Sequence, residues 1–327
     1  MEDVLAVRHS SARPSHGTQR LFRAAVTGKQ TKLKLSRKLH ADEAFRAILA
    51  DCLGAASAQA GVLRAGRSVE ALHHLRVALR RLEVMLGAFG KAFAQDWFAD
   101  LRSRTKAISA KLSPARDLDV FLHDLWPAAT APFKDGRGGG DFAALRRDAE
   151  TLRDGTWAGV EACLASEDFS HLLDDVAALS RSRLPMGGEE KLKTVARGLL
   201  KTAAKRVRIR GRKARGLEER ELHRLRIALK KLRYVAQVFS PLYKKSKARS
   251  YLAALKRLQE ELGHLNDIAH ARATIAELLR VGLSAEIGYS AGMFAGHYAA
   301  GRGAHAKKAM KRYRDFKDMK RFWVSRK

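Results

Sequence analysis

The sequence contains one helical motif twice, separated by 150 residues. LHHLRVALRRL at 72–82 returns as LHRLRIALKKL at 222–232, and seven of the eleven positions are identical. A second pair of motifs, LSPARDLDV at 112–120 and LGHLNDIAH at 262–270, has the same separation. Two motifs at one offset favour an internal duplication. A period this long predicts two similar helical bundles related by a pseudo-two-fold axis, because solenoids are built from much shorter repeats.

The remainder of the chain predicts an all-α fold. From Ala41 onward apolar residues follow a helical period, β-branched residues are few, and prolines lie between the periodic segments. We expect a basic disordered tail at 1–36, a first helical repeat at 37–184, and a second repeat at 185–327 that ends in a basic tail. A loop at PMGG, 185–188, separates the repeats. The expected helices are 41–65, 68–90, 94–112, 115–126, 141–165, 168–182, 189–214, 218–240, 245–262, 265–281, 284–300 and 303–319.

The positive charge is concentrated in one part of the chain. The 327 residues carry a formal net charge of +30, and residues 191–250 alone hold 21 Lys and Arg against 3 Asp and Glu. A focused field of this kind indicates a polyanionic partner. No apolar run reaches the length of a membrane span. The two cysteines lack metal-ligand spacing, which is typical of buried thiols in a reducing compartment, so we expect a cytoplasmic protein.

The repeated helix separates its leucines from its cations. At about 100° per residue, the leucines of each copy fall on one face and form a buried stripe. The basic residues cluster on the opposite side and its flanks. In the first copy they are His73, Arg76, Arg80 and Arg81, and in the second copy they are His223, Arg226, Lys230, Lys231 and Arg233. Arginine contacts phosphate oxygens bidentately and lysine acts as a point charge, so the two stripes suit a phosphate-rich ligand.

A second cationic stripe is predicted on the helix 189–214. Its basic residues recur at spacings of four, four and three: Arg197, Lys201, Lys205 and Arg208. Beside the helix 218–240 they would form a continuous basic groove. The matching segment of the first repeat, 41–65, has no such stripe. Two other interpretations stay open: the stripes are ordinary solvated faces, or His73 and His223 are metal ligands or phosphoacceptors.

Three further features were interpreted structurally. Asp117 and Asp267 occupy equivalent positions near expected helix starts, where a carboxylate is favourable, and Asp117 is also placed to orient Arg76 or Arg116. Glycines at every fourth residue near the C-terminus predict a smooth face for close helix packing, and the last aromatics are expected to dock on the bundle. These residues are Gly288, Gly292 and Gly296, followed by Phe316, Phe322 and Trp323.

At these residues the chain resembles the CHAD family, the conserved histidine α-helical domain. The resemblance covers nearly the whole chain from about Lys38, and it includes Arg116-Asp117 with its partner Asn266-Asp267 and the Gly-rich C-terminal helix. It implies two helical bundles with a basic groove or pore between them, binding of inorganic polyphosphate, association with polyphosphate granules, and no catalytic activity or cofactor. The implied ligands are the His, Arg and Lys residues of the two repeated helices, together with Arg116.

Two other functions are compatible with a basic helical protein: nucleic-acid binding and phosphate chemistry. A basic helical protein binds DNA or RNA non-specifically almost by default, although only Tyr234 interrupts the stripes with an aromatic ring. Hydrolysis or transfer of phosphate needs carboxylates that hold a metal or an activated nucleophile, and the repeated helices offer almost only cations. We therefore expect a non-enzymatic polyphosphate-binding protein, with nucleic-acid binding as the alternative. The sequence leaves the oligomeric state open.

Overall fold

The computed structural model describes residues 33, 35–93, 97–133, 142–182, 190–280 and 285–324, and these residues are mainly helical, without a named β-strand. The all-α prediction is therefore confirmed. Most of the predicted tail and the PMGG loop lie outside the described residues. The helices of the first repeat are α2 (Ala41–Ala65), α3 (Val69–Phe93), α4 (Trp97–Lys111), α5 (Ser113–Val120), α6 (Trp126–Thr130), α7 (Phe142–Ala165) and α8 (Glu167–Arg181). Those of the second are α9 (Leu192–Lys213), α10 (Glu219–Phe239), α11 (Lys245–Leu279) and α12 (Ala285–Lys317).

Two long helices replace the four short ones predicted near the C-terminus. The prediction that helices end near residues 262 and 300 is wrong, because α11 continues through Gly263 and α12 through Gly301. Glycine costs an interior helical position only about 1 kcal/mol, which packing offsets easily. Proline is a stronger breaker. Pro114 lies at the start of α5 and separates it from α4, whereas the equivalent position in the second repeat is His264 and the helix runs on.

The two repeats share one hydrophobic core at one end of the molecule. This main core joins residues of α2, α3, α4 and α8 to residues of α9, α10 and α11. Phe89 of α3 and Phe239 of α10, which are 150 residues apart in sequence, lie with ring centroids 6.2 Å apart. The starts of α2 and α9 are also joined, since Ala41 N donates to Glu190 O and Leu192 N donates to Leu39 O. The repeats are therefore not separately packed bundles.

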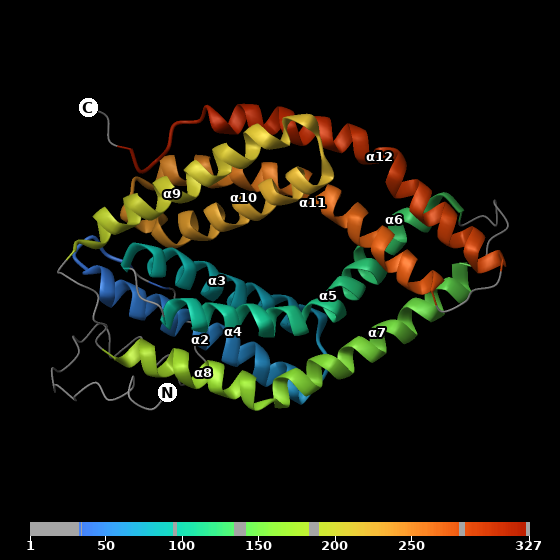
Figure 1. Cartoon of the computed structure of the whole chain (residues 1–327), viewed down its shortest axis with the longest axis horizontal. Coiled ribbons are helices and arrows are strands. Elements are labelled where there is room, and N and C mark those ends of the chain that lie inside the picture. The colour runs from blue at the N-terminus through green and yellow to red at the C-terminus, as the bar shows by residue number, and fades with distance from the viewer. Residues whose placement is uncertain are drawn as a thin grey trace.

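A second, smaller core closes the other end of the molecule. This distal core contains Phe121 and Trp126 from the first repeat and Ile275 and Phe294 from the second. It exists because α11 and α12 are long enough to reach the α5–α7 region (Figure 1). The two repeats thus meet at both ends of the molecule. The region between the main core and the distal core carries charged side chains.

Three smaller predictions have different outcomes. Phe322 and Trp323 are buried against Tyr251, as expected for aromatics that dock on the bundle. The close-packing role predicted for Gly288, Gly292 and Gly296 is wrong, because a Cβ built at any of the three meets nothing within 4 Å. Leu35, assigned to the tail, is buried in the main core, and Leu33 and Leu39 pack against that core. These short alternations of leucine and basic residues show no helical period, so the sequence did not reveal the contact.

Candidate functional site

The repeated motifs form α3 and α10, and their leucine stripes are buried as predicted. The four leucines of each motif are at most 4% exposed, and they all belong to the main core. This packing fixes the rotation of both helices about their axes. The opposite faces, which carry the basic residues, are exposed or half-buried.

The basic faces of α3 and α10 converge on Lys230. Its pKa is lowered from 10.5 to about 7, first by burial and then by the charges of Arg226, Arg80, Arg233 and Arg76. Arg76 and Arg80 belong to α3, so cations of the first repeat act directly on a lysine of the second. Burial makes the largest contribution to this shift, and the like charges of both repeats add to it.

The pKa values of other residues are also affected by charges in the opposite repeat. The pKa of His73 is lowered by burial and then by Arg116, with Lys230 of the other repeat among the remaining causes. The pKa of Arg226 is lowered mainly by burial, and Arg80 contributes. Burial likewise lowers the pKa of His223. We define the central cluster as the basic residues linked by these couplings: His73, Arg76, Arg80, Arg116, His223, Arg226, Lys230 and Arg233.

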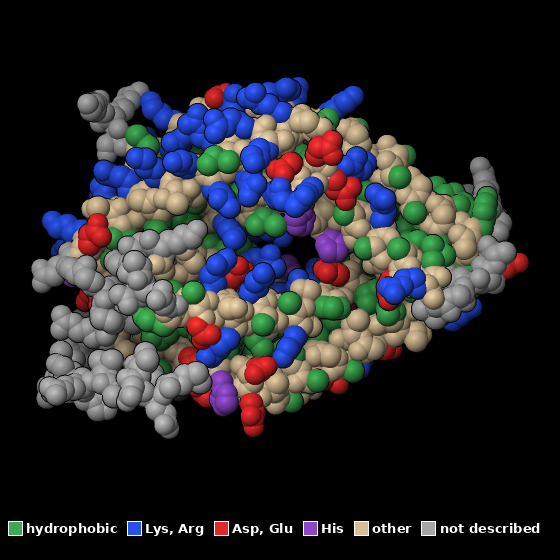
Figure 2. Space-filling view, viewed as in Figure 1, with side chains coloured by type: hydrophobic (Ala, Val, Ile, Leu, Met, Phe, Trp, Pro, Cys, Tyr) green, Lys and Arg blue, Asp and Glu red, His purple; other side chains and the backbone are tan. Residues whose placement is uncertain are grey.

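Figure 2 shows how side chains of each type are distributed on one face of the molecule. The surface is hollowed between the two repeats, and Lys, Arg and His side chains gather around the hollow. Among the described residues, no carboxylate forms an ion pair within 4.0 Å of Arg80, Arg226 or Lys230. Arg80, Arg226 and Lys230 are therefore cations that are partly withdrawn from water and have no ion-pair partner within 4.0 Å in the part of the chain that the structure describes.

Two aspartates interact electrostatically with cations of the central cluster. Asp267 on α11 has a raised pKa because it is buried, and Arg226 opposes that rise. Burial lowers the pKa values of Arg76 and Arg226, and Asp117 on α5 opposes that fall for both arginines, so it acts on both repeats. Its Oδ2 atom also lies 3.7 Å from Nδ1 of His270 on α11. These carboxylates offset part of the repulsion among the cations. The hydrogen bond predicted from Asp117 to Arg76 or Arg116 is not found among the described residues: Arg76 Nη1 donates to Ser109 O, and Arg116 lies beside Asp124.

His270 was not identified from the sequence. It lies close enough to His223 to lower the pKa of that imidazole, and its contact with Asp117 joins α11 to α5. The equivalent residue in the first repeat is Val120, so a search for paired motifs gives no signal at this position. Only the folded arrangement, in which α11 crosses to α5, brings His270 to the cluster.

Several predicted ligands lie outside the central cluster or have other partners. Arg81 is bound to Asp51 of α2, with Nη1 2.5 Å from Oδ2. Lys231 also has a partner within the protein. Arg116 lies 3.9 Å from Asp124, and Arg233 lies over the ring of Tyr234 with its Nε buried and without a hydrogen-bond partner.

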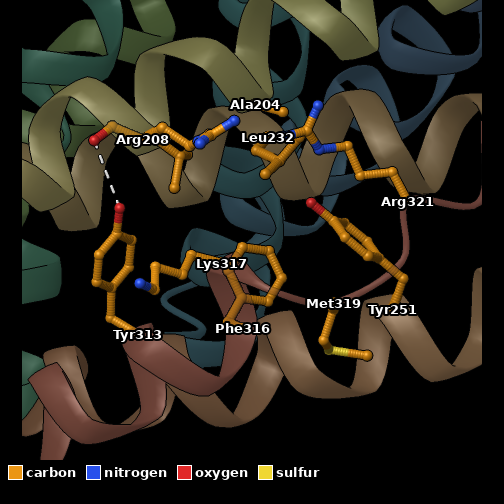
Figure 3. Close-up of a pocket in the computed structure, with 10 residues that line it drawn as sticks. Ala204, Arg208, Leu232, Tyr251, Tyr313, Phe316, Lys317, Met319 and Arg321 are labelled. Carbon is orange, nitrogen blue, oxygen red and sulfur yellow. Dashed lines mark hydrogen bonds between the residues drawn. The ribbon is translucent and has the colours of Figure 1, made fainter. Parts of the chain in front are cut away.

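The predicted stripe of α9 lies exposed along the outside of the bundle. Its members are Arg197, Lys201, Lys205 and Arg208. Arg208 lines a small pocket with Lys317 and Arg321 of the C-terminal segment (Figure 3), and its carbonyl accepts a hydrogen bond from the Tyr313 hydroxyl. The α9 stripe is therefore next to the C-terminal segment. The helix α9 also packs against α10, as expected, and the continuous groove between the two helices stays a prediction.

The chemistry of the central cluster is that of an anion receptor. Arginines offer planar sets of N–H donors, and a half-neutral lysine gains a full charge when an anion approaches. Within the described part of the chain, no group of three or more His, Cys, Asp or Glu side chains is arranged to hold a metal ion. In the same part, no helix has the length and apolar character needed to cross a bilayer.

Comparisons with known proteins identify the fold. The crystal structure of the CHAD domain from the plant Ricinus communis matches with a TM-score of 0.77 and 25% sequence identity, over 90% of this chain and 96% of that chain. PptA from Streptomyces chartreusis matches with a TM-score of 0.60 and 19% identity, over 85% of this chain and 99% of that one. A search of curated proteins finds no match. The family model for the CHAD domain matches residues 47–276, a range that includes every predicted ligand, and the chain therefore belongs to the CHAD domain family.

Proposed function

We propose that the protein binds inorganic polyphosphate in the central cluster, without chemical change to the polymer. The observation that carries this proposal is that the charges of Arg76 and Arg80, in the first repeat, contribute to the lowered pKa of Lys230 in the second. The basic residues of both repeats therefore lie close enough to contact one ligand. Keeping partly buried cations close together costs the free protein stability. A ligand with a negative charge on every unit would remove that cost. The CHAD family is commonly linked to polyphosphate binding, which agrees with this ligand.

The geometry of the cluster favours a linear chain of phosphates over nucleic acid. Non-specific single-strand binding relies on exposed aromatic rings on which bases stack. Tyr234, the one aromatic ring within the basic stripe of α10, is 7% exposed and is covered by the Arg233 side chain. Polyphosphate has no bases, so cations alone are sufficient to hold it.

Binding is proposed to be non-catalytic and to take place at polyphosphate granules in the cytoplasm. Asp117 and Asp267 already interact with cations of the cluster, which leaves them poorly placed to hold a metal ion or to activate water. Incubation of polyphosphate with stoichiometric protein and divalent metals should release no phosphate. Sustained release would refute this part of the proposal.

The decisive experiment compares two neutralising variants. Arg226→Gln with Lys230→Met removes two cations of the cluster, and Lys106→Gln with Arg181→Gln removes two exposed cations from α4 and α8. Loss of two charged hydrogen bonds should weaken tripolyphosphate binding by about 100-fold in the first variant. The second should change it by less than about twofold, because exposed charges are screened. Equal losses in the two variants would refute a defined site.

A competition experiment separates polyphosphate from nucleic acid. If the central cluster evolved for a phosphate chain, polyphosphate should displace DNA at a lower concentration of phosphate groups. Displacement in the opposite order would favour the nucleic-acid function instead.

A further inference from the structure

A second cationic surface lies apart from the central cluster. We define the outer face as the exposed basic residues along α9 together with two residues of the C-terminal segment: Arg197, Lys201, Lys205, Arg208, Arg212, Lys320 and Arg321. From the first to the last α9 residue it extends about 22 Å, at 1.5 Å per residue. Among the described residues, no carboxylate forms an ion pair with the α9 members. A face built only for solubility would mix both signs of charge.

The internal repeat shows that the fold itself does not require these cations. In the first repeat α2 takes the place of α9, and the positions equivalent to Arg197, Lys201 and Lys205 are Ala47, Asp51 and Ala55. Asp51 is used to bind Arg81, so the equivalent position even carries the opposite charge. Both helices pack against their neighbours through apolar faces. The requirements of the fold therefore do not explain the cations of α9, because α2 occupies the equivalent place without them.

The outer face is held rigidly by the C-terminal part of the chain. Gly211 of α9 contacts Tyr313 of α12 so closely that an added Cβ would lie 1.9 Å from the ring. Phe322 and Trp323 anchor the following segment on Tyr251. Figure 3 shows Arg208, Lys317 and Arg321 brought together by this packing, although Lys317 is paired with Asp318. Segments separated by more than 100 residues therefore contribute to one preorganised surface.

The outer face and the hollow lie on the same side of the molecule. Figures 1 and 2 have the same view. In Figure 2, Lys and Arg side chains extend from the rim of the hollow to the region that α9 occupies in Figure 1. Successive cations of the α9 stripe lie three or four residues apart, a spacing of about 5–6 Å that suits a polymer with regularly repeated charge. The aromatic residues beneath the face, Tyr313 and Phe316, are buried, so they offer no surface on which bases could stack.

We infer that the outer face is a second contact surface for polyphosphate, onto which a long chain continues from the hollow. This inference rests on the proposed function of the central cluster. It predicts selectivity for chain length, because two contact surfaces joined by one polymer act together. Linking two contacts typically raises affinity by about 10²–10⁴-fold without any new contact. A chain too short to leave the hollow gains nothing from α9.

The test is a comparison of two charge-reversal variants with two ligands. Lys201→Glu with Lys205→Glu alters the outer face, and Lys106→Glu with Arg181→Glu alters exposed positions of α4 and α8 by the same net charge. Each is titrated with tripolyphosphate and with long-chain polyphosphate after circular dichroism has confirmed helical folding. We expect the outer-face variant to lose at least about tenfold in affinity for the long chain and less than about twofold for tripolyphosphate. The control variant should change both affinities equally and slightly.

The outcomes distinguish the two proposals. Wild-type protein that fails to bind tripolyphosphate would refute the central site. Normal tripolyphosphate binding combined with an unchanged long-chain affinity in the outer-face variant would overturn the second contact surface alone. Equal losses of affinity for both ligands would also overturn it, because they would show that the substitutions weaken only the general electrostatic attraction for anions. Loss of duplex DNA or anionic-vesicle binding, with intact long-chain binding, would assign the face to a different partner.

Discussion

Lys230 should make polyphosphate binding depend on pH in a specific way. In the free protein its pKa is lowered to about 7, first by burial and then by the surrounding arginines. The charged groups that act on it are Arg226 and Arg233 of α10, Arg76 and Arg80 of α3, and Asp267 of α11. A bound phosphate chain replaces repulsion by attraction and returns the pKa toward its ordinary value. Binding must then take up a proton at any pH between the two values.

The size of the effect follows from linkage. If the bound state restores the ordinary pKa of 10.5, affinity for tripolyphosphate falls by up to about 50-fold between pH 7 and pH 9, because each pH unit above the free-state pKa costs about 1.4 kcal/mol. The arginines stay protonated throughout this range. The terminal phosphates of the ligand also titrate, but their protons are common to the wild type and to Lys230→Met. The difference between the pH profiles of the two proteins therefore reports Lys230.

Calorimetry in two buffers of different ionisation enthalpy measures this proton directly. At pH 8 we expect the wild type to take up close to one proton more per bound tripolyphosphate than Lys230→Met does. The affinity of the wild type should also fall more steeply between pH 7 and pH 9 than that of the Met variant. Equal proton uptake by the two proteins at pH 8 would refute the reasoning.

Three further predictions concern stability. Because unfolded Lys230 binds more protons than folded Lys230 between pH 7 and 10.5, the free energy of unfolding should rise with pH across this window. Lys230→Met should stabilise the free protein at pH 7 by up to about 4 kcal/mol, a gain that disappears above the unfolded pKa; a flat pH profile of the wild-type melting temperature would contradict this. Gly211→Ala should cost about 1–3 kcal/mol in urea denaturation, because its Cβ would overlap Tyr313, and an unchanged midpoint would disprove the contact. Phe239→Ala should cost about 3–5 kcal/mol, because Phe239 is fully buried and lies against Phe89 between the two repeats; a loss below 1 kcal/mol would argue against the shared core.

The fold was largely predictable because helical period is a local property. The stripe of leucines at 72–82 and its copy at 222–232 fixed which faces of α3 and α10 are buried. Helix ends at Pro114 were also predictable, since proline removes a donor and clashes with the preceding turn. The ends expected near Gly263 and Gly301 were not real, because tertiary packing decides whether a glycine interrupts a helix.

The site was predictable only as far as single helices determine it. The cationic faces of α3 and α10 follow from spacing alone. The burial of Lys230 and the approach of His270 to Asp117 depend on how the helices cross, and no local pattern encodes this. Arg81 shows the same limit, because its partner Asp51 lies on another helix. The outer position of the α9 stripe likewise depends on where the C-terminal segment docks.

The most direct test is a crystal structure with bound tripolyphosphate. Our account predicts phosphate density in the hollow, contacted at the same time by Arg76 or Arg80 from α3 and by Arg226 or Lys230 from α10. Phosphate density that lies elsewhere, or that contacts the cations of one repeat only, would contradict the claim that the two repeats form one shared site.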